Sequence, residues 1–294
     1  MPTPTYPLTW DAVGEHLYET GTDKGVVYPY DSSEKEYGTG VAWNGLTGFT
    51  DNPSGADETK LWADNIKYVS MRAAEEYGGT ITAYTYPDEF AECDGSAFAD
   101  TGKIVSIGQQ KRKSFGFSCR TLVGNDTELN DYGYKLHLVY GASVSPSSKD
   151  YKTVNESPDA IEFSWEFTTT PVDVGTNYKP TSHIMIDTSK IGESDTEAKE
   201  ALTKLENILY GTSTAQYVKM TKATEPEDWP EDSTPSTKYF KNTGTASSPV
   251  YTGVTSSDVY AANTYFQKFE PAPARLPSPA EVIELFGGSV NSVG

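Results

Sequence analysis

The sequence predicts a mainly β protein, an antiparallel β-sandwich or barrel with one flanking α-helix and a small β-rich segment near the C-terminal end. Several segments alternate apolar and polar residues with a period of two, which is typical of strands with one buried face. Gly and Pro turns separate these segments, as in antiparallel sheets. One later segment has helical spacing instead, and 294 residues suffice for a large core.

The first pair of predicted strands occupies residues 41–50 and 61–68, with a polar segment between them. The backbone groups of so long and polar a connection need water or a partner, so we expect a loop that projects from the body. The loop has no apolar anchors to offset the entropy of ordering it, and we expect it to become ordered only against a neighbouring subunit. The candidate contact residues are Asp51, Asn52, Pro53, Ser54, Gly55, Ala56, Asp57 and Glu58.

Residues 115–120, 132–140 and 161–168 show the clearest alternation. In the last of these, four apolar side chains point to one face and four polar side chains to the other. The apolar set is Ile161, Phe163, Trp165 and Phe167, and the polar set is Glu162, Ser164, Glu166 and Thr168. In 132–140 the same rule puts His137 on the polar side, which predicts a solvated histidine.

A helix is predicted near 195–210. Ser194 and Glu197 have the spacing of a capping box, and Gly211 supplies a C-terminal stop. The apolar face consists of Ala198, Ala201, Leu202, Leu205, Ile208 and Leu209. Such a face either covers a sheet or forms a subunit interface, and both interpretations stay open here.

After the helix the composition changes. Residues 212–270 contain short strand-like runs among many Thr, Ser and Pro residues, which favours a small β unit over an extended loop. Residues 271–294 form a C-terminal tail with one helical turn that begins at Pro279. The predicted organisation is therefore a β domain over 1–211, a decoration or insertion over 212–270, and this tail.

Composition excludes several functions. The formal net charge is −19, from 42 acidic against 23 basic residues, which disfavours spontaneous nucleic-acid binding. The two cysteines, Cys93 and Cys119, are too few for a secreted disulfide scaffold, so we expect free thiols. With no secretory signal and no run of about 18 apolar residues, we expect a protein made in a cytoplasm with no membrane partner.

The sequence contains no recognisable set of catalytic residues. His16, His137 and His183 lie far apart in sequence, and none has the spacing of a zinc site. The chain lacks a nucleophile elbow, a phosphate-binding loop and a dinucleotide fingerprint, and its acidic clusters lack calcium-loop spacing. We therefore predict no catalytic residue, no metal and no cofactor.

An ordered set of short motifs carries a family resemblance. The motifs occupy residues 40–45, 79–88, 89–95, 108–113, 124–127, 134–141 and 163–171, together with the segment around 41–68. Taken in this order, they resemble the major tail proteins of long-tailed bacteriophages, with more likeness to non-contractile tails. The resemblance implies a structural virion protein that forms hexameric rings, stacked into a tail tube through which DNA is delivered. It implies as partners the tape-measure protein and the tail-end proteins, and assembly in the host cytoplasm.

Given this resemblance, two groups of charged residues are candidate functional residues. The run Lys111, Arg112 and Lys113 is unexpected in so acidic a chain. It either protects a strand or loop end, or meets acidic residues of a neighbouring subunit, or contacts DNA. Glu162 and Glu166 either line the tube lumen, where they would let DNA slide without specific binding, or lie on the outer surface.

Two competing functions come from other classes. The 20 Tyr and 5 Trp residues suggest a carbohydrate-binding or adhesin-type β-sandwich, although aromatic side chains on strands are more often core. A β-fold hydrolase is disfavoured because no acid/base pair stands out in the sequence.

Overall fold

The computed structural model describes residues 10, 12–55, 58–153, 159–175, 177–192, 194–220, 225–245 and 248–288. It divides into two compact units. The N-terminal unit runs to Asp173 and includes Pro180–Lys190, and the C-terminal unit comprises Val174–Lys179 and the residues from Ile191 onward. The boundary predicted at 211 falls inside the second unit, because the long helix belongs with the C-terminal segments.

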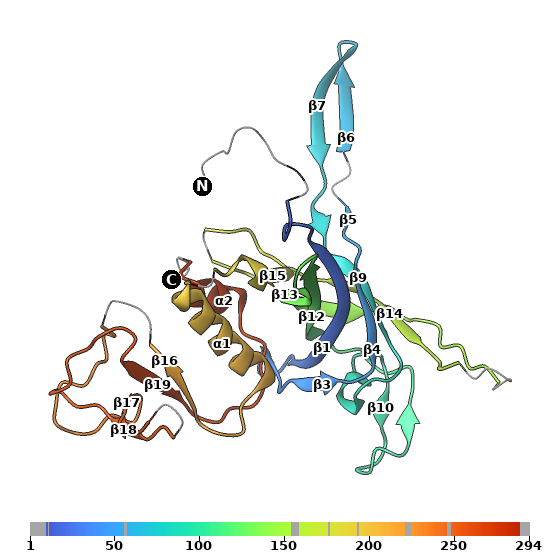
Figure 1. Cartoon of the computed structure of the whole chain (residues 1–294). Helices are drawn as coiled ribbons and strands as arrows, with labels where there is room; N and C mark the ends of the chain where they lie inside the picture. The colour runs from blue at the N-terminus through green and yellow to red at the C-terminus, as the bar shows by residue number, and fades with distance from the viewer. Residues whose placement is uncertain are drawn as a thin grey trace. The chain divides into compact units, whose positions relative to one another are not determined.

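The N-terminal unit is built on one antiparallel sheet, which confirms the predicted mainly β class (Figure 1). Its strands lie in the order β2-β1-β12-β13-β14-β9-β4, with β3 on β1 and β15 on β13. Their bounds are β1 Tyr18–Asp31, β2 Glu36–Tyr37, β3 Val41–Trp43, β4 Leu46–Asp51, β9 Gly78–Ala83, β12 Phe115–Asn125, β13 Leu129–Val144, β14 Phe163–Thr169 and β15 His183–Asp187. A two-stranded sheet of β10 (Ala97–Phe98) and β11 (Ser106–Ile107) follows the 3-10 turn Asp88–Phe90.

The main sheet is strongly curled. In a flat sheet, β4 and β12 would lie about 19 Å apart, since four spacings of about 4.8 Å separate them. Phe49 of β4 nevertheless packs against Phe117 of β12, with 5.7 Å between ring centroids. Strand β4 also contacts β1, so the two ends of the sheet approach each other around the core in a barrel-like manner.

An aromatic core fills the inside of the curl. Trp165 of β14 is fully buried, and its ring lies 5.4 Å from those of Trp43, Tyr86 and Phe90. Along β14, Trp165 and Phe167 are buried while Ser164, Glu166 and Thr168 are exposed, which confirms the predicted alternation. The strand begins at Phe163, two residues later than the alternation indicates.

The first predicted hairpin is wrong in its connectivity. The polar segment is no tip loop: after β4, the chain continues through β5 (Ser54–Gly55) into β6 (Glu58–Ala63). Asp64 and Asn65 then turn the chain with φ of 51° and 61°, and β7 (Ile66–Arg72) and β8 (Glu75–Glu76) return it to β9. Two positive φ values in a two-residue connection make a type I′ turn, for which Asp and Asn are well suited. The predicted strand 61–68 therefore straddles the real turn.

The C-terminal unit contains both helices and a four-stranded sheet. Helix α1 spans Thr196–Tyr210, close to the prediction, and Gly211 ends it with φ of 71°. Its N-cap is Asp195, whose Oδ1 accepts a hydrogen bond from the Ala198 amide at 3.0 Å, so the predicted cap at Ser194 is one residue too early. Helix α2 spans Pro279–Leu285 and begins at the predicted proline.

The sheet of this unit has the strand order β16-β19-β17-β18, all antiparallel. The bounds are β16 Gln216–Lys219, β17 Tyr239–Asn242, β18 Tyr251–Gly253 and β19 Tyr265–Phe269. It encloses a core of its own from Met220, Trp229, Tyr239, Val254 and Tyr265. The segment therefore folds as a small β unit, as predicted, rather than as an extended loop.

Both cysteines are free, as the composition predicts, and both are buried. Burial raises the pKa of Cys93 to about 12 and also raises that of Cys119, so neither forms the reactive thiolate near neutral pH. We expect no alkylation of the native chain by iodoacetamide at pH 8 and modification of both thiols in 6 M guanidinium. Mass spectrometry checks this, and fast labelling of the native protein would contradict the burial.

Candidate functional site

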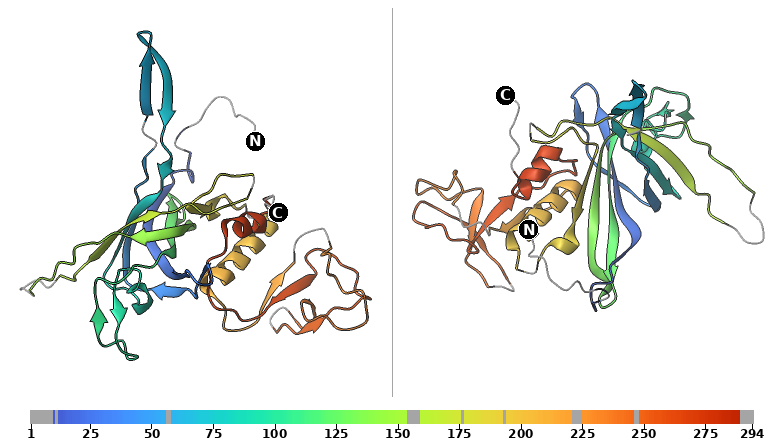
Figure 2. Two further views of the ribbon diagram at one scale, coloured as in Figure 1. Left: turned by 180° about the vertical axis from the view of Figure 1, so that it is seen from behind. Right: turned by 90° about the horizontal axis from the view of Figure 1, so that it is seen from above.

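A two-stranded arm extends from the main sheet of the N-terminal unit (Figures 1 and 2). We define the arm as strands β5 to β8. Among the described residues, β6 pairs only with β7, and β5 only with β8. An isolated two-stranded ribbon is marginally stable in water and leaves the outer edges of both strands unpaired.

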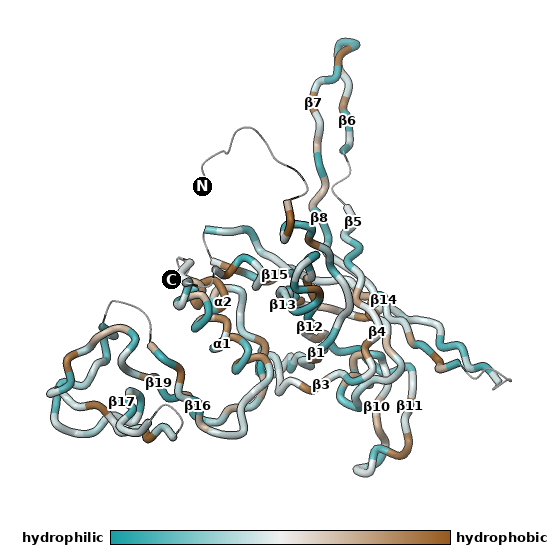
Figure 3. The backbone as a smooth tube through the Cα atoms, viewed as in Figure 1, coloured by the Kyte–Doolittle hydropathy of each residue, from teal (hydrophilic) through white to brown (hydrophobic). Residues whose placement is uncertain are grey.

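Hydrophobic residues occur along the outer part of the arm (Figure 3). Several large apolar side chains there are exposed to solvent. Trp62 is 67%, Ile66 63% and Tyr68 73% exposed. The remaining members of this set are Leu61, Val69 and Met71. Exposed apolar groups gathered on one element mark interaction sites, since burying each side chain contributes about 1.5–3 kcal/mol.

Polar contacts hold the arm in register. Lys67 Nζ lies 2.6 Å from Glu58 Oε1 across the two strands, and Ser70 also hydrogen-bonds to Glu58. We call the place where the arm joins the main sheet, next to β4 and β9, the root of the arm. There the backbone amide of Asn52 donates a hydrogen bond to the Gly78 carbonyl at 2.8 Å, and the Tyr77 hydroxyl donates one to Asp51. These contacts tie the two strands to each other and leave the apolar side chains uncovered.

The predicted contact residues lie along the ascending side of this arm. Asp51 ends β4, Ser54 and Gly55 form β5, and Glu58 opens β6, with Asn52 and Pro53 between. Ala56 and Asp57 fall outside the described residues. The role of this segment in a subunit contact stays a prediction. Sequence reasoning missed the apolar residues beyond it, and the signal that could have found them is an Asp-Asn pair flanked by apolar runs.

A second candidate surface is the polar face of β14 and its neighbours. Glu166 lies opposite Thr80 of β9, which lies opposite Thr50 of β4. The next row consists of Ser164, Thr82 and Gly48. Glu162 accepts a hydrogen bond from the Thr47 hydroxyl. Glu166 therefore shares a face with the hydroxyl side chains of Thr80 and Thr50, and Glu162 is bound to Thr47 of β4.

The basic run is largely neutralised within the chain. Lys113 Nζ lies 2.5 Å from Glu92 Oε2, and Arg112 lies 3.7 Å from Asp94 and donates to the Val144 carbonyl at 3.3 Å. Lys111 is exposed. Two of the three cations thus have partners in their own chain, which weakens the argument for a contact with DNA. An intersubunit role stays a prediction.

The solvated position predicted for His137 is wrong. His137 is only 7% exposed and stacks on His183, with ring centroids 5.4 Å apart. Strand β13 is buried on both faces between residues 136 and 140. The alternation of apolar and polar residues along it therefore does not mark a solvent-exposed face. The histidine packs against Phe49, on the inner side of the curl.

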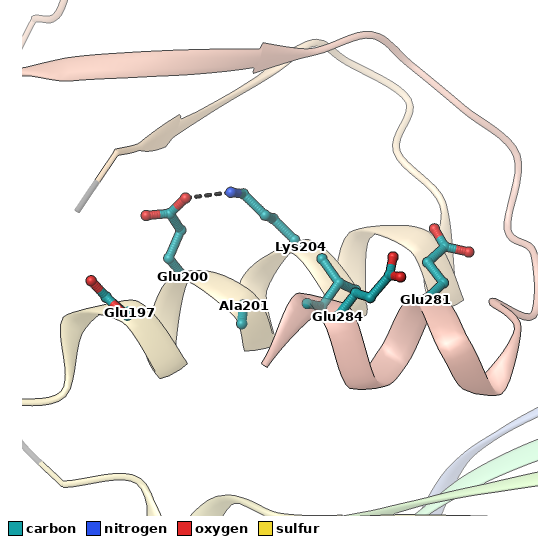
Figure 4. Close-up of a pocket in the computed structure, with 7 residues that line it drawn as sticks. Glu197, Glu200, Ala201, Lys204, Glu281 and Glu284 are labelled. Carbon is teal, nitrogen blue, oxygen red and sulfur yellow. Dashed lines mark hydrogen bonds and ion pairs between the residues drawn. The ribbon is translucent and has the colours of Figure 1, made fainter. Parts of the chain in front are cut away.

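A shallow pocket of about 230 Å³ lies between the two helices of the C-terminal unit (Figure 4). Its charged lining is Glu197, Glu200, Lys204, Glu281 and Glu284. Lys204 is paired with Glu200 one turn away. The pocket therefore presents mainly negative charge with its cation already neutralised.

In the described part of the chain, no helix has the length and apolar character needed to cross a membrane.

Comparisons with known proteins identify no family for this chain. No protein-family model matches the chain, and no curated protein sequence matches it. Among solved structures, the chain is similar to the sheath-tube complex of an extracellular contractile injection system in the extended state. The match has 14% identity and a TM-score of 0.23, and covers 56% of this chain and 88% of the other. At that TM-score the similarity carries no argument for fold or function.

Proposed function

We propose that this protein is a self-assembling structural subunit, the major tail protein of a bacteriophage tail tube. The observation that carries the proposal is the arm, a narrow ribbon with large apolar side chains in water. Burial of these side chains against a second copy of the chain would stabilise an assembly. The motif resemblance supplies the kind of assembly, which is hexameric rings stacked along an axis.

Head-to-tail stacking gives the arm its role. An interface between unlike surfaces of identical subunits extends into a filament when it does not close on itself. In the proposed tube, the arm of one ring docks on the body of the next ring and buries its apolar residues there. The unpaired edges of β6 and β7 also offer backbone hydrogen bonds to a partner strand.

The location and the partners of the protein follow from this proposal. The tube belongs to the virion tail, of the non-contractile type that the resemblance favours, and is assembled in the host cytoplasm. Its partners are other copies of itself, the tape-measure protein and the tail-end proteins, and DNA passes without specific binding. We propose no enzymatic activity and no membrane partner for this role.

The carbohydrate-binding alternative loses its main support in the C-terminal unit. Trp229, Tyr239 and Tyr265 are each less than 10% exposed, and the Trp229 ring lies 5.2 Å from that of Tyr239 and 5.0 Å from that of Tyr265. Buried rings cannot form a sugar platform. Negative-stain electron microscopy of the purified, untagged chain at rising concentration tests the two functions. Rings or tubes support the tail assignment, whereas monomers at every concentration would oppose it.

The lumen assignment of Glu162 and Glu166 predicts a charge effect on DNA passage. Six copies of two glutamates per ring would repel phosphate weakly but at every ring. In virions assembled with Glu162→Lys and Glu166→Lys together, we expect intact tubes but ejection slowed at least about tenfold at low salt, because the new cations bind phosphate. The slowing should fade as salt rises.

The matched control is Glu225→Lys with Glu227→Lys, which changes the net charge by the same four units in the C-terminal unit. We expect normal ejection from that control. Normal ejection at low salt from the Glu162/Glu166 variant would refute the lumen assignment and place both residues on the outer surface.

The small β unit is predicted to be dispensable for assembly. Thr212 and Ala272 exchange two backbone hydrogen bonds, of 2.9 and 3.2 Å, so the ends of the intervening segment already lie side by side. Its core residues are all inside the segment. Replacing 213–271 by a short Gly-Ser linker should retain α1 and α2 and give thinner tubes by electron microscopy. A folded variant that fails to assemble would place this segment in the tube wall.

A further inference from the structure

Three potential metal ligands converge at the root of the arm. Asp51 ends β4, His137 lies in β13, and His183 opens β15. One ligand atom from each lies within 4.8 Å of the other two. The registers of β13 with β15, and the curl that brings β4 across the sheet, create this cluster from residues up to 132 positions apart.

The spacing of the two imidazoles fits a single ion. His137 Nδ1 lies 3.2 Å from His183 Nε2. Two nitrogens bound at 2.0–2.1 Å in tetrahedral geometry are about 3.3 Å apart. Little rearrangement would therefore bring both nitrogens into a first coordination sphere, with the metal replacing the hydrogen bond that now joins them.

The surrounding groups orient the ligands. Thr121 Oγ1 lies 3.0 Å from His137 Nε2, so this hydroxyl can accept a hydrogen bond from the Nε2 proton when Nδ1 binds the metal. The Tyr77 hydroxyl donates to Asp51, and the Tyr77 ring stacks on His183 at 4.7 Å. Metal sites characteristically have such outer contacts to both the histidine and the carboxylate ligands.

We propose that Asp51, His137 and His183 bind a divalent transition-metal ion, with Zn²⁺ as the best-suited occupant. Two imidazoles and one carboxylate favour zinc, cobalt or nickel over magnesium and calcium, which prefer all-oxygen sites. Asp51 is exposed and His183 partly so, which leaves an open side for entry and for a water ligand. A bound ion would join the root of the arm to the strands of the body.

Titration of the untagged, chelator-stripped full chain with ZnCl₂ tests the site. Isothermal calorimetry should give one ion per chain, and CoCl₂ should give the intense visible absorption of a tetrahedral centre. MgCl₂ and CaCl₂ should give neither signal. We expect Asp51→Asn or His183→Asn to weaken zinc binding at least about 100-fold, and Tyr77→Phe to weaken it about 10–100-fold.

The matched control is His16→Asn, which removes another histidine that pairs with an aspartate, Asp126, at 3.1 Å on the surface. It should bind zinc as the wild type does. Circular dichroism of each variant separates loss of the site from loss of the fold, and His183 is chosen over the more buried His137 for that reason. The absence of stoichiometric binding by the wild type, or unchanged affinity in folded His183→Asn, would overturn the proposal.

Discussion

Replacing Trp62, Ile66 and Tyr68 of the arm by Ser should abolish assembly and leave a folded monomer. All three side chains are more than 60% exposed and contribute little to the monomer's own core. If each contributes at least about 1.5 kcal/mol when buried in the tube, the loss of all three costs at least about 4.5 kcal/mol for each arm that docks. That corresponds to a rise of roughly a thousandfold in the concentration needed for assembly. Sedimentation velocity and negative-stain microscopy measure this directly.

The control for this triple variant is Val259→Ser. Val259 is 83% exposed in the small β unit, which we expect to be dispensable. Its replacement should leave the assembly concentration unchanged. If the arm variant polymerises at wild-type concentration, the exposed apolar residues are not a subunit contact and the proposed function loses its main support.

Trp165→Ala should destabilise the N-terminal unit by about 3–5 kcal/mol. Trp165 is fully buried, and Trp43, Tyr86, Phe90 and Phe163 surround its ring at 5.4–5.8 Å. Truncation removes the buried indole and leaves a cavity that the surrounding rings fill only partly. Urea unfolding of the dispersed monomer, followed by far-UV circular dichroism, gives the change in unfolding free energy.

Trp165→Phe is the graded comparison. The indole Nε1 is buried without a hydrogen-bond partner among the described residues, so phenylalanine loses volume but no hydrogen bond. We expect less than half the destabilisation of the alanine variant. A loss below about 1 kcal/mol for Trp165→Ala would show that this ring is not the centre of the core.

Local sequence patterns predicted the elements whose signals are local. The period-two pattern around Trp165 predicted the inward and outward faces of β14, and Gly211 predicted the end of α1. The projection near residues 51–60 is predicted, but its strand bounds are wrong because the predicted strand 61–68 runs across Asp64 and Asn65, which form the turn. A turn that needs two positive φ values overrides the strand propensity of its neighbours.

The histidine cluster could not be predicted from sequence spacing. His137 and His183 are 46 positions apart, and only the register of β13 with β15 makes them neighbours. The period-two pattern predicts that His137 is solvent-exposed, because the pattern assumes one buried and one exposed strand face. Strand β13 is instead covered on both faces around this residue. The third ligand, Asp51, joins them only because the sheet curls.

A cryo-electron microscopy reconstruction of the assembled, untagged chain tests the central claim most directly. The account predicts a tube of stacked six-membered rings in which Trp62, Ile66 and Tyr68 of one subunit are buried against a subunit of the adjacent ring. A tube in which the arm remains in solvent, or a purified chain that stays monomeric at every concentration, would contradict it.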